Sequence, residues 1–247
     1  MIQIIELCKS FNGQVVLDRV NLTVPRGRIT VVIGKSGVGK SVLLKHIVGL
    51  LHPDAGQVLV DGQDIHRLRG QKLREFKLRL AVLFQGGALF DSLNIFENIA
   101  FPLREKTRLP EAEIARRVRQ RLEEMNLSAD VEGKFPAELS GGMKKRVALA
   151  RAMIQEPELI LFDEPVTGLD PPMCNTVFHL IKKTHRNRGY TALMVSHDIP
   201  EVFQVADFVA MLHKGRIIAH GTPAEVQASE DPVVQAFLRG EPDFLEE

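Results

Sequence analysis

The 247-residue sequence contains no tryptophan, one tyrosine and only two cysteines. Cys8 and Cys174 are far apart and match no metal or redox spacing, so we expect two unpaired thiols in a reducing compartment. A net charge of +1 gives no electrostatic reason to expect a nucleic acid partner. No apolar run approaches the length of about 20 residues that crosses a bilayer. The segment Met1–Ile5 lacks a basic n-region, which argues against a signal peptide. We therefore expect any membrane role to depend on a partner.

The remaining composition is that of an ordinary soluble globular protein, with 45% hydrophobic and 26% charged residues. The length suits one large domain or two small ones. None of the eight histidines lies at ligand spacing from a cysteine or carboxylate, so we expect no structural zinc. The sequence shows no internal repeat and no low-complexity segment.

Residues 34–41 fit a phosphate-binding loop at every fixed position of the pattern G-x-x-x-x-G-K-[ST]. The β-branched run Arg28–Ile33 before the loop predicts a buried strand, and Val42–Val48 after it predicts a helix that Gly49 ends. Backbone N–H groups of such a loop and helix start bind polyphosphate. Lys40 would reach the β- and γ-phosphates, and the Ser41 hydroxyl would ligate Mg²⁺. The sequence therefore predicts nucleoside triphosphate binding.

A second apolar strand, Leu159–Phe162, ends in the two carboxylates Asp163 and Glu164. Carboxylates are costly at the end of a buried strand unless they have a function there. Asp163 would hold Mg²⁺, directly or through water. Glu164 would accept a proton from the attacking water, or orient that water. Pro165 turns the chain at this edge, which argues against a plain surface acidic pair.

Two further polar residues follow apolar strands. Gln85 follows Leu80–Phe84 and can reach Mg²⁺ or the attacking water, although the residue alone favours an ordinary loop amide. His197 follows the run Thr191–Val195. A lone histidine is usually structural, but this one lies at the carboxyl end of a parallel strand, where ligands bind in open α/β sheets.

Ser140 is a natural N-cap before two glycines and a helix predicted at 144–155, which indicates a second helix start able to accept phosphate oxygens. Phe11 lies before an Asn12-Gly13 turn that joins strands predicted at 2–7 and 15–24. From its position, Phe11 is equally consistent with stacking on a purine and with a half-buried strand aromatic.

Residues 104–127 are charged and helical in pattern, with Pro110 in a first turn. Arg116, Arg117, Arg119 and Arg121 predict a solvated face. The segment 88–96 before them is too apolar for a solvated loop, which indicates either a docking surface for another protein or burial within the chain. A helix at 172–188, a hairpin of strands 208–212 and 216–219, and short helices at 223–228 and 231–239 complete the chain.

These motifs occur in the order found in the nucleotide-binding subunits of ABC transporters, which the chain resembles over essentially its full length. The resemblance implies an α/β fold, a P-loop NTPase of the ABC type with a RecA-like core, a small antiparallel β subdomain and an inserted α-helical subdomain. It implies one ABC ATPase domain over 1–247. Residues 1–85 and 158–222 would form the core with the β subdomain, 86–157 the helical subdomain with the signature motif, and 223–247 the C-terminal helices and short tail.

The resemblance also implies site residues. Catalytic roles fall on Glu164, His197, Gln85 and Lys40. ATP contacts fall on Phe11, Val16, Gly34, Lys35, Ser36, Gly37, Val38, Gly39, Lys40, Ser41, Ser140, Gly141, Gly142 and Asp170. Mg²⁺ ligation falls on Ser41, Gln85 and Asp163. Two copies would pair head to tail, with ATP between the phosphate loop of one and the Ser140 and Gly142 backbone of the other. ATP would then hold this homodimer shut until hydrolysis and phosphate release let it open.

A closer likeness is carried by Leu83–Leu93, Leu139–Met143, Val195–Val202 and Asp231–Gly240. These stretches resemble the ATPases of Mla/MCE phospholipid transport systems of Gram-negative bacteria and plastids. That likeness implies phospholipid traffic between inner and outer membranes, which helps to keep the outer membrane asymmetric. It implies an integral-membrane permease, a periplasmic MCE-domain lipid-binding protein and a small STAS-domain subunit as partners. The ATPase would lie at the cytoplasmic face of the inner membrane.

The sequence departs from this family in two places and leaves other functions open. The chain ends at Glu247, so an arm reaching the opposite subunit would be short, and Phe11 stands where tyrosine is usual. One alternative is an ABC importer ATPase for another substrate, such as an amino acid. A soluble ABC protein of translation or DNA repair is disfavoured by the single motif set and the lack of heptads. A subunit that only binds ATP is disfavoured because the chain contains all of Lys40, Asp163, Glu164 and His197.

Overall fold

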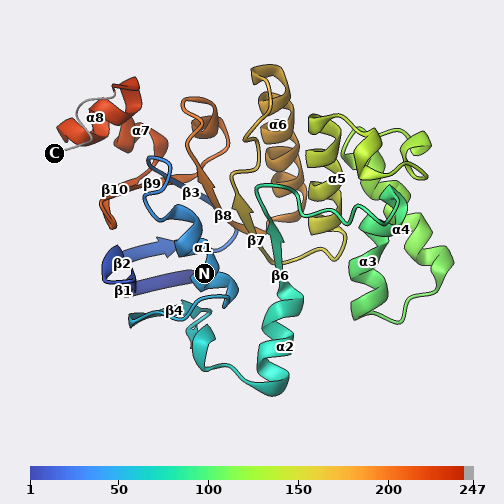
Figure 1. Ribbon diagram of the computed structural model, residues 1–247, viewed down its shortest axis with the longest axis horizontal. Coiled ribbons are helices and arrows are strands. Elements are labelled where there is room, and N and C mark those ends of the chain that lie inside the picture. Colours follow the sequence, from blue (N-terminus) through green and yellow to red (C-terminus); the bar gives the residue numbers. More distant parts are fainter. Residues whose placement is uncertain (242–247) are drawn as a thin grey trace. The chain divides into compact units, whose positions relative to one another are not determined.

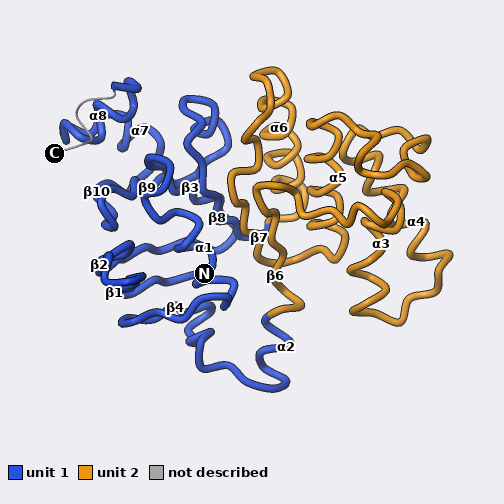
Figure 2. Tube along the Cα trace, viewed as in Figure 1, with its two compact units in different colours: residues 1–76, 190–247 blue, residues 77–189 orange. Residues whose placement is uncertain are grey.

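The computed structural model describes residues 1–241, and the chain divides into two compact units (Figure 2). The first unit comprises residues 1–76 and 190–247, and the second comprises residues 77–189. Helix α2 (Gly70–Arg79) carries the chain from the first unit into the second, and strand β8 (Thr191–Ser196) begins just after its return. The subdomain boundaries expected from the ABC resemblance stay a prediction.

An antiparallel sheet of the first unit contains strands β1 (Ile2–Phe11), β2 (Gln14–Val24), β4 (Ala55–Val60) and β5 (Gln63–Asp64), in the order β2-β1-β4-β5 (Figure 1). Asn12 and Gly13 join β1 to β2 with φ angles of 49° and 82°, as expected of an Asn-Gly hairpin turn. The strand β1 extends to Phe11 rather than to residue 7, because its pairing with β2 resumes after register shifts.

The other strands of the first unit lie in the order β10-β9-β3-β8. Strand β3 (Ile29–Ile33) is parallel to both β8 and β9 (Phe208–His213), whereas β10 (Arg216–Gly221) is antiparallel to β9. Every residue of β3 and β8 is buried, which explains why most of their residues are apolar. The unit also contains helices α1 (Lys40–Val48), α7 (Pro223–Gln227) and α8 (Pro232–Arg239), and Gly49 ends α1 as expected.

The second unit contains the parallel pair β6 (Leu80–Leu83) and β7 (Leu159–Asp163). Its helices are α3 (Ile95–Lys106), α4 (Glu111–Glu124), α5 (Gly141–Met153) and α6 (Pro171–Arg188). Helix α5 contacts the other three helices and β6. Val147 and Leu149 of α5 are fully buried and lie at the centre of this packing.

The helical interpretation of residues 104–127 was wrong in its bounds. The region holds the end of α3 and the whole of α4, with Pro110 as the N-cap of α4 rather than in its first turn. Helix α3 begins at Ile95, inside the apolar segment 88–96, because Asn94 and Glu97 form a capping box at its start. Helix α2 lies in a stretch for which no element was predicted from the sequence.

One of the four arginines expected on a solvated face is buried. Arg121 is 4% exposed and pairs with Glu124, and burial lowers the pKa of its guanidinium below the ordinary value. Arg116 and Arg119 are exposed, as expected, and form ion pairs with Glu113 and Glu132. Arg121 also lies 3.6 Å from the carboxylate of Glu156, so this buried arginine links α4 to another segment of the second unit.

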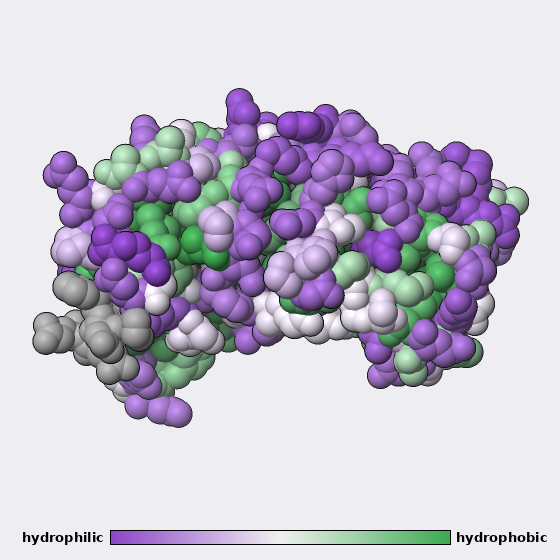
Figure 3. All heavy atoms as spheres, turned by 90° about the horizontal axis from the view of Figure 1, so that it is seen from above, coloured by the Kyte–Doolittle hydropathy of each residue, from purple (hydrophilic) through white to green (hydrophobic). Residues whose placement is uncertain are grey.

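Among residues 1–241, no helix is both long and apolar enough to cross a membrane. Figure 3 shows hydrophilic residues over much of the face that it presents, with hydrophobic residues in separate areas between them.

Candidate functional site

The phosphate-binding loop of the first unit runs from the end of β3 to the start of α1 (Figure 1). Two of its glycines are required by close approaches of the backbone. Gly34 has a φ angle of 153°, and a Cβ there would lie 2.4 Å from the backbone oxygen of Leu212. Gly39 has a φ angle of 110°, and a Cβ there would lie 3.1 Å from Val16. The local fold therefore depends on glycine at both ends of the loop.

Lys40 and Ser41 begin α1. The Lys40 ammonium donates hydrogen bonds to the carbonyl oxygens of Gly34 at 2.8 Å and Lys35 at 2.9 Å, so it lies across the loop. The N-cap residue Gly39 has no side chain to bond the N–H groups of the first helical turn. A helix start of this kind, with an ammonium beside it, suits a phosphate group.

The strand register brings His197 to the same edge as the loop. Ile33, the last residue of β3, pairs with Ser196, the last residue of β8. Gly34 and His197 are the next residues on two adjacent parallel strands. His197 is exposed, and the preceding Ser196 hydroxyl donates to Asp198 at 2.9 Å in the same loop. The expectation that His197 follows the carboxyl end of a parallel strand is confirmed.

Phe11 and Val16 lie on the two strands of the β1–β2 hairpin. Phe11 is 40% exposed, so its ring is accessible to solvent, and both interpretations, purine stacking and a half-buried strand aromatic, stay predictions. Val16 is half-buried and reaches the loop through its contact with Gly39. The first unit thus joins the hairpin to the phosphate loop.

In the second unit, Gln85 and Glu164 are held together. They follow the paired residues Leu83 and Phe162 of β6 and β7, each two positions later. The Gln85 amide donates a hydrogen bond to Glu164 Oε2 at 3.1 Å. The hydroxyl of Thr167 donates to the same oxygen, also at 3.1 Å. Glu164 is 9% exposed and has a φ angle of 48°, a conformation rare for a residue with a side chain.

Asp163, one residue earlier, is the last residue of β7 and is half-buried. The Lys145 ammonium of α5 bonds the backbone oxygen of Gln85. An amide oxygen at Gln85 and a carboxylate at Asp163 are the kinds of ligand that Mg²⁺ prefers. Among residues 1–241, no cluster of three or more histidine, cysteine or acidic side chains is placed to hold a metal ion.

Ser140 is the N-cap of α5, as the sequence predicted, and its hydroxyl accepts from the backbone N–H of Met143 at 3.3 Å. Gly142 is buried beneath the side chain of Met173, whose Cε lies 2.3 Å from the position that a Cβ would take. Asp170 is the N-cap of α6 and accepts from the N–H of Met173 at 2.9 Å. Met173 therefore links the starts of two helices within the second unit.

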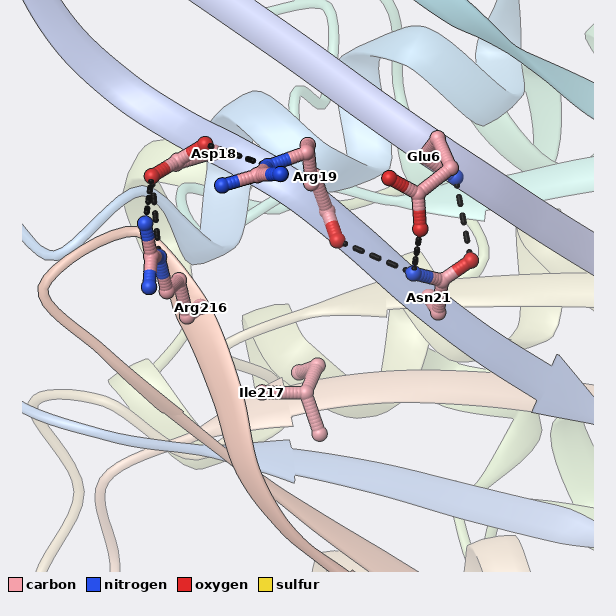
Figure 4. A pocket seen from close by; sticks show the side chains of 6 residues that line it. All are labelled: Glu6, Asp18, Arg19, Asn21, Arg216 and Ile217. Carbon is pink, nitrogen blue, oxygen red and sulfur yellow. Dashed lines mark hydrogen bonds and ion pairs between the residues drawn. The ribbon is translucent and has the colours of Figure 1, made fainter.

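A polar pocket of about 330 Å³ on the first unit contains none of the residues that the sequence predicted for the site (Figure 4). Its lining residues are Glu6, Asp18, Arg19, Asn21, Arg216 and Ile217. The Asn21 amide donates to Glu6 and to the backbone oxygen of Arg19. Glu6 and Arg19 each have a φ angle of 47°. Arg216 donates to Asp18 and lowers the pKa of that carboxyl. Polar groups of the pocket thus bond one another across irregular strands.

Several residues in contact with the predicted site were not found from the sequence. Thr167 bonds Glu164, and Lys145 bonds Gln85. Lys9 lies beside Phe11, with its ammonium 5.3 Å from the ring centre. The spacing of Lys9 and Phe11, two residues apart on one strand, was the only sequence signal that could have linked them.

Comparison with known proteins extends the argument beyond these contacts. The ABC transporter family matches residues 17–167. The chain is 43% identical, over 98% of its length and 92% of the relative, to the intermembrane phospholipid transport system ATP-binding protein MlaF of Haemophilus influenzae. It is 42% identical to the probable ribonucleotide transport ATP-binding protein mkl of Mycobacterium tuberculosis, over 97% of this chain and 66% of that protein.

Solved structures give the same fold. The dimeric, post-hydrolysis structure of the ATP-binding cassette MJ0796 bound to ADP and Pi superposes with a TM-score of 0.82 and 28% identity. The match covers 90% of this chain and 99% of the other. The expected α/β fold of an ABC-type P-loop ATPase is therefore confirmed.

Proposed function

This chain belongs to the ABC transporter family of ATPases, and from that premise we propose that it hydrolyses ATP to move phospholipids between the inner and outer membranes. The observation that carries the proposal is the 43% identity, across nearly the whole of both chains, to a protein named for intermembrane phospholipid transport. The chain keeps both the phosphate loop at residues 34–41 and the carboxylates Asp163 and Glu164 that hydrolysis needs.

We assign ATP binding to the phosphate loop, with Lys40 on the β- and γ-phosphates and Phe11 stacked on the base. The uncapped start of α1 supports this role, because its N–H groups receive no bond from an N-cap side chain. The oxygens of Ser41, Gln85 and Asp163 fit Mg²⁺, which is a hard cation. Bound Mg²⁺ would neutralise charge on the phosphates.

Glu164 is the proposed base that takes a proton from the attacking water. Its support is the double anchoring of Oε2 by Gln85 and Thr167, which restricts the carboxylate to one orientation. His197 is assigned to the γ-phosphate, since it follows the strand that pairs with the one leading into the phosphate loop. Glu164 would thus act on the oxygen of the attacking water, and His197 on an oxygen of the γ-phosphate.

We also propose a head-to-tail homodimer in which Ser140, Gly141, Gly142 and Asp170 act on the nucleotide of the other copy. The dimeric state of the ADP-bound cassette MJ0796 supports this assembly. Ser140 and Asp170 are exposed N-cap residues of long helices, so a second copy can reach them.

The proposed membrane partner is a permease, with the ATPase held peripherally at the cytoplasmic face of the inner membrane. Three phenylalanines of the second unit support a docking surface: Phe84, Phe90 and Phe101 are 39%, 43% and 38% exposed. The Phe90 and Phe101 rings lie 5.0 Å apart, and Arg151 lies over Phe90. A periplasmic MCE-domain protein and a STAS-domain subunit complete the proposed complex.

A second candidate function is the same ATPase driving another substrate. The similarity to a mycobacterial protein named for ribonucleotide transport supports this second candidate.

The experiment is to purify the chain in complex with its permease and measure phosphate release with and without phospholipid vesicles. We expect co-purified phospholipid and ATPase activity that phospholipid stimulates. The Lys40→Ala variant is the negative control, because it removes the ammonium that faces the phosphates. Activity stimulated by a nucleotide or amino acid, but not by phospholipid, would overturn the phospholipid assignment in favour of the second candidate.

A further inference from the structure

Lys9 occupies a restricted position beside Phe11. Its side chain is only 16% exposed, although lysine is usually among the most solvent-accessible residues. The ammonium lies 5.3 Å from the centre of the Phe11 ring, within the range of a cation–π contact. Phe11 itself remains 40% exposed. The cation therefore lies against an aromatic ring that is still partly exposed to solvent.

Asp54 fixes the lysine from the other side. Its Oδ1 accepts from the Lys9 ammonium at 2.7 Å, and its Oδ2 accepts from the backbone N–H of Ser10, also at 2.7 Å. The backbone N–H of Asp54 donates to the oxygen of Cys8 at 2.9 Å. The hydrogen bond from Lys9 lowers the pKa of the Asp54 carboxyl, so it stays charged at neutral pH. Three consecutive residues of β1 are thus bound to one aspartate.

We propose that Lys9, held by Asp54, positions the Phe11 ring so that it stacks on the purine base of the nucleotide. The inference rests on the proposed role of Phe11 and adds two positioning residues to it. An exposed phenylalanine next to a hairpin turn can adopt several rotamers, and stacking on a base needs one of them in advance. A cation fixed against the ring favours that rotamer and leaves the rest of the ring accessible. Lys9 and Asp54 thereby strengthen binding of the base and do not affect binding of the phosphates.

The test compares two ligands, a non-hydrolysable ATP analogue and inorganic tripolyphosphate, by calorimetry on the full chain with Mg²⁺. Lys9→Met keeps the apolar stem and removes the charge, and Asp54→Asn keeps the shape and removes the anion. We expect each variant to lower the affinity for the ATP analogue about two- to fivefold, the scale of an exposed cation–π contact. Tripolyphosphate affinity should stay unchanged in both.

Conservative and control variants separate positioning from general structure or charge. Lys9→Arg should restore the affinity for the ATP analogue, because guanidinium also stacks on aromatic rings. Lys72→Met removes a charge from an exposed position on α2 and should change the affinity for neither ligand. An equal loss of affinity for both ligands in Lys9→Met would overturn the inference, since Lys9 would then act on the phosphates or on folding.

The Phe11→Ala variant distinguishes failure of this inference from failure of the proposed role of Phe11. Phe11→Ala should weaken the ATP analogue, and adding Lys9→Met to it should have no further effect. If Phe11→Ala weakens the analogue but Lys9→Met and Asp54→Asn do not, the positioning role is wrong and the stacking role stands. If Phe11→Ala leaves the analogue unchanged, the stacking role itself is wrong, and the inference falls with it.

Discussion

The side-chain amide of Gln85 donates a 3.1 Å hydrogen bond to Glu164 Oε2. In the sequence 78 residues lie between these two residues, and the pairing of β6 with β7 brings them together. Because this carboxylate is buried, anchored and adjacent to Asp163, it is the group on which the proposed hydrolysis depends. Its replacement gives the most direct test of the site.

Glu164→Gln should keep nucleotide binding and slow turnover by about 10²–10⁴-fold, the usual loss when general-base assistance is removed. Glutamine has nearly the same shape and can still accept a hydrogen bond from Gln85, so the local fold should persist. Phosphate release gives the turnover, and titration with labelled ATP gives the binding. Hydrolysis at the parental rate would show that the base lies elsewhere.

Thr167→Val should lower turnover by a smaller factor, about 10- to 100-fold, the scale of one hydrogen bond to a charged carboxylate. Valine has the shape of threonine but cannot donate to Glu164, so Oε2 of the carboxylate loses the bond from Thr167 and keeps the one from Gln85. Thr167→Ser keeps the hydroxyl and serves as the matched control. Steady-state kinetics should show the loss in kcat with KM unchanged. Equal losses in the serine and valine variants would assign Thr167 a packing role.

The parts of the fold that could be predicted are those with a strong local signal. Strands β3 and β8 are buried on both faces, and most of their residues are therefore apolar, the exceptions being Thr30, Thr191 and Ser196. Helix α2 has no such signal, because Phe76 is its only buried residue, while Leu73 is half-buried and Leu78 is exposed. Helix α3 was missed at its start, since an apolar segment can be a helix or a loop until the Asn94 cap is considered.

The candidate site divides in the same way. The phosphate loop and the Asp163-Glu164 pair are contiguous motifs, so their positions could be identified from the sequence, while their chemical roles stay predictions. The contacts of Thr167 with Glu164 and of Met173 with Gly142 depend on how the chain turns after a strand or how two helices pack. Spacing alone does not encode such contacts, because other residues at the same distance along the chain point elsewhere.

Gly34→Ala should destabilise the first unit more than Gly37→Ala. Both glycines have positive φ angles, of 153° and 81°, so both substitutions introduce backbone strain of about 1–3 kcal/mol. Only at Gly34 would the new Cβ meet the backbone, 2.4 Å from the oxygen of Leu212, whereas nothing lies within 4 Å at Gly37. A backbone oxygen in a buried strand cannot move aside as a flexible side chain does. Urea unfolding without nucleotide measures the difference, and equal losses would show that the close approach is relieved at no cost.

The stability of the chain should fall as the pH falls below about 6.5, partly because of a histidine group in the first unit. His46 is fully buried, and its ring centre lies 6.3 Å from that of His66, which lies 5.1 Å from that of His52. Burial lowers the pKa of both His46 and His66 below the ordinary value of about 6.5. The charge of Lys9 lowers the pKa of His46 further, while Asp54 and Asp64 act in the opposite direction on His46 and His66.

The sign follows from comparing the folded and unfolded chains. In the unfolded chain these histidines take up protons near pH 6.5, whereas the folded chain resists protonation until a lower pH. Stability is therefore fully present above the unfolded pKa and decreases as the pH falls, by at most about 1.4 kcal/mol per pH unit for each proton. The free energy of unfolding in urea, measured at pH 7.5, 6.5 and 5.5, should show this decrease. His46→Gln should make it shallower, because glutamine does not titrate, whereas His179→Asn at an exposed position of α6 should leave it as in the parent. A His46→Gln profile parallel to that of the parent would mean that His46 does not contribute to the acid sensitivity.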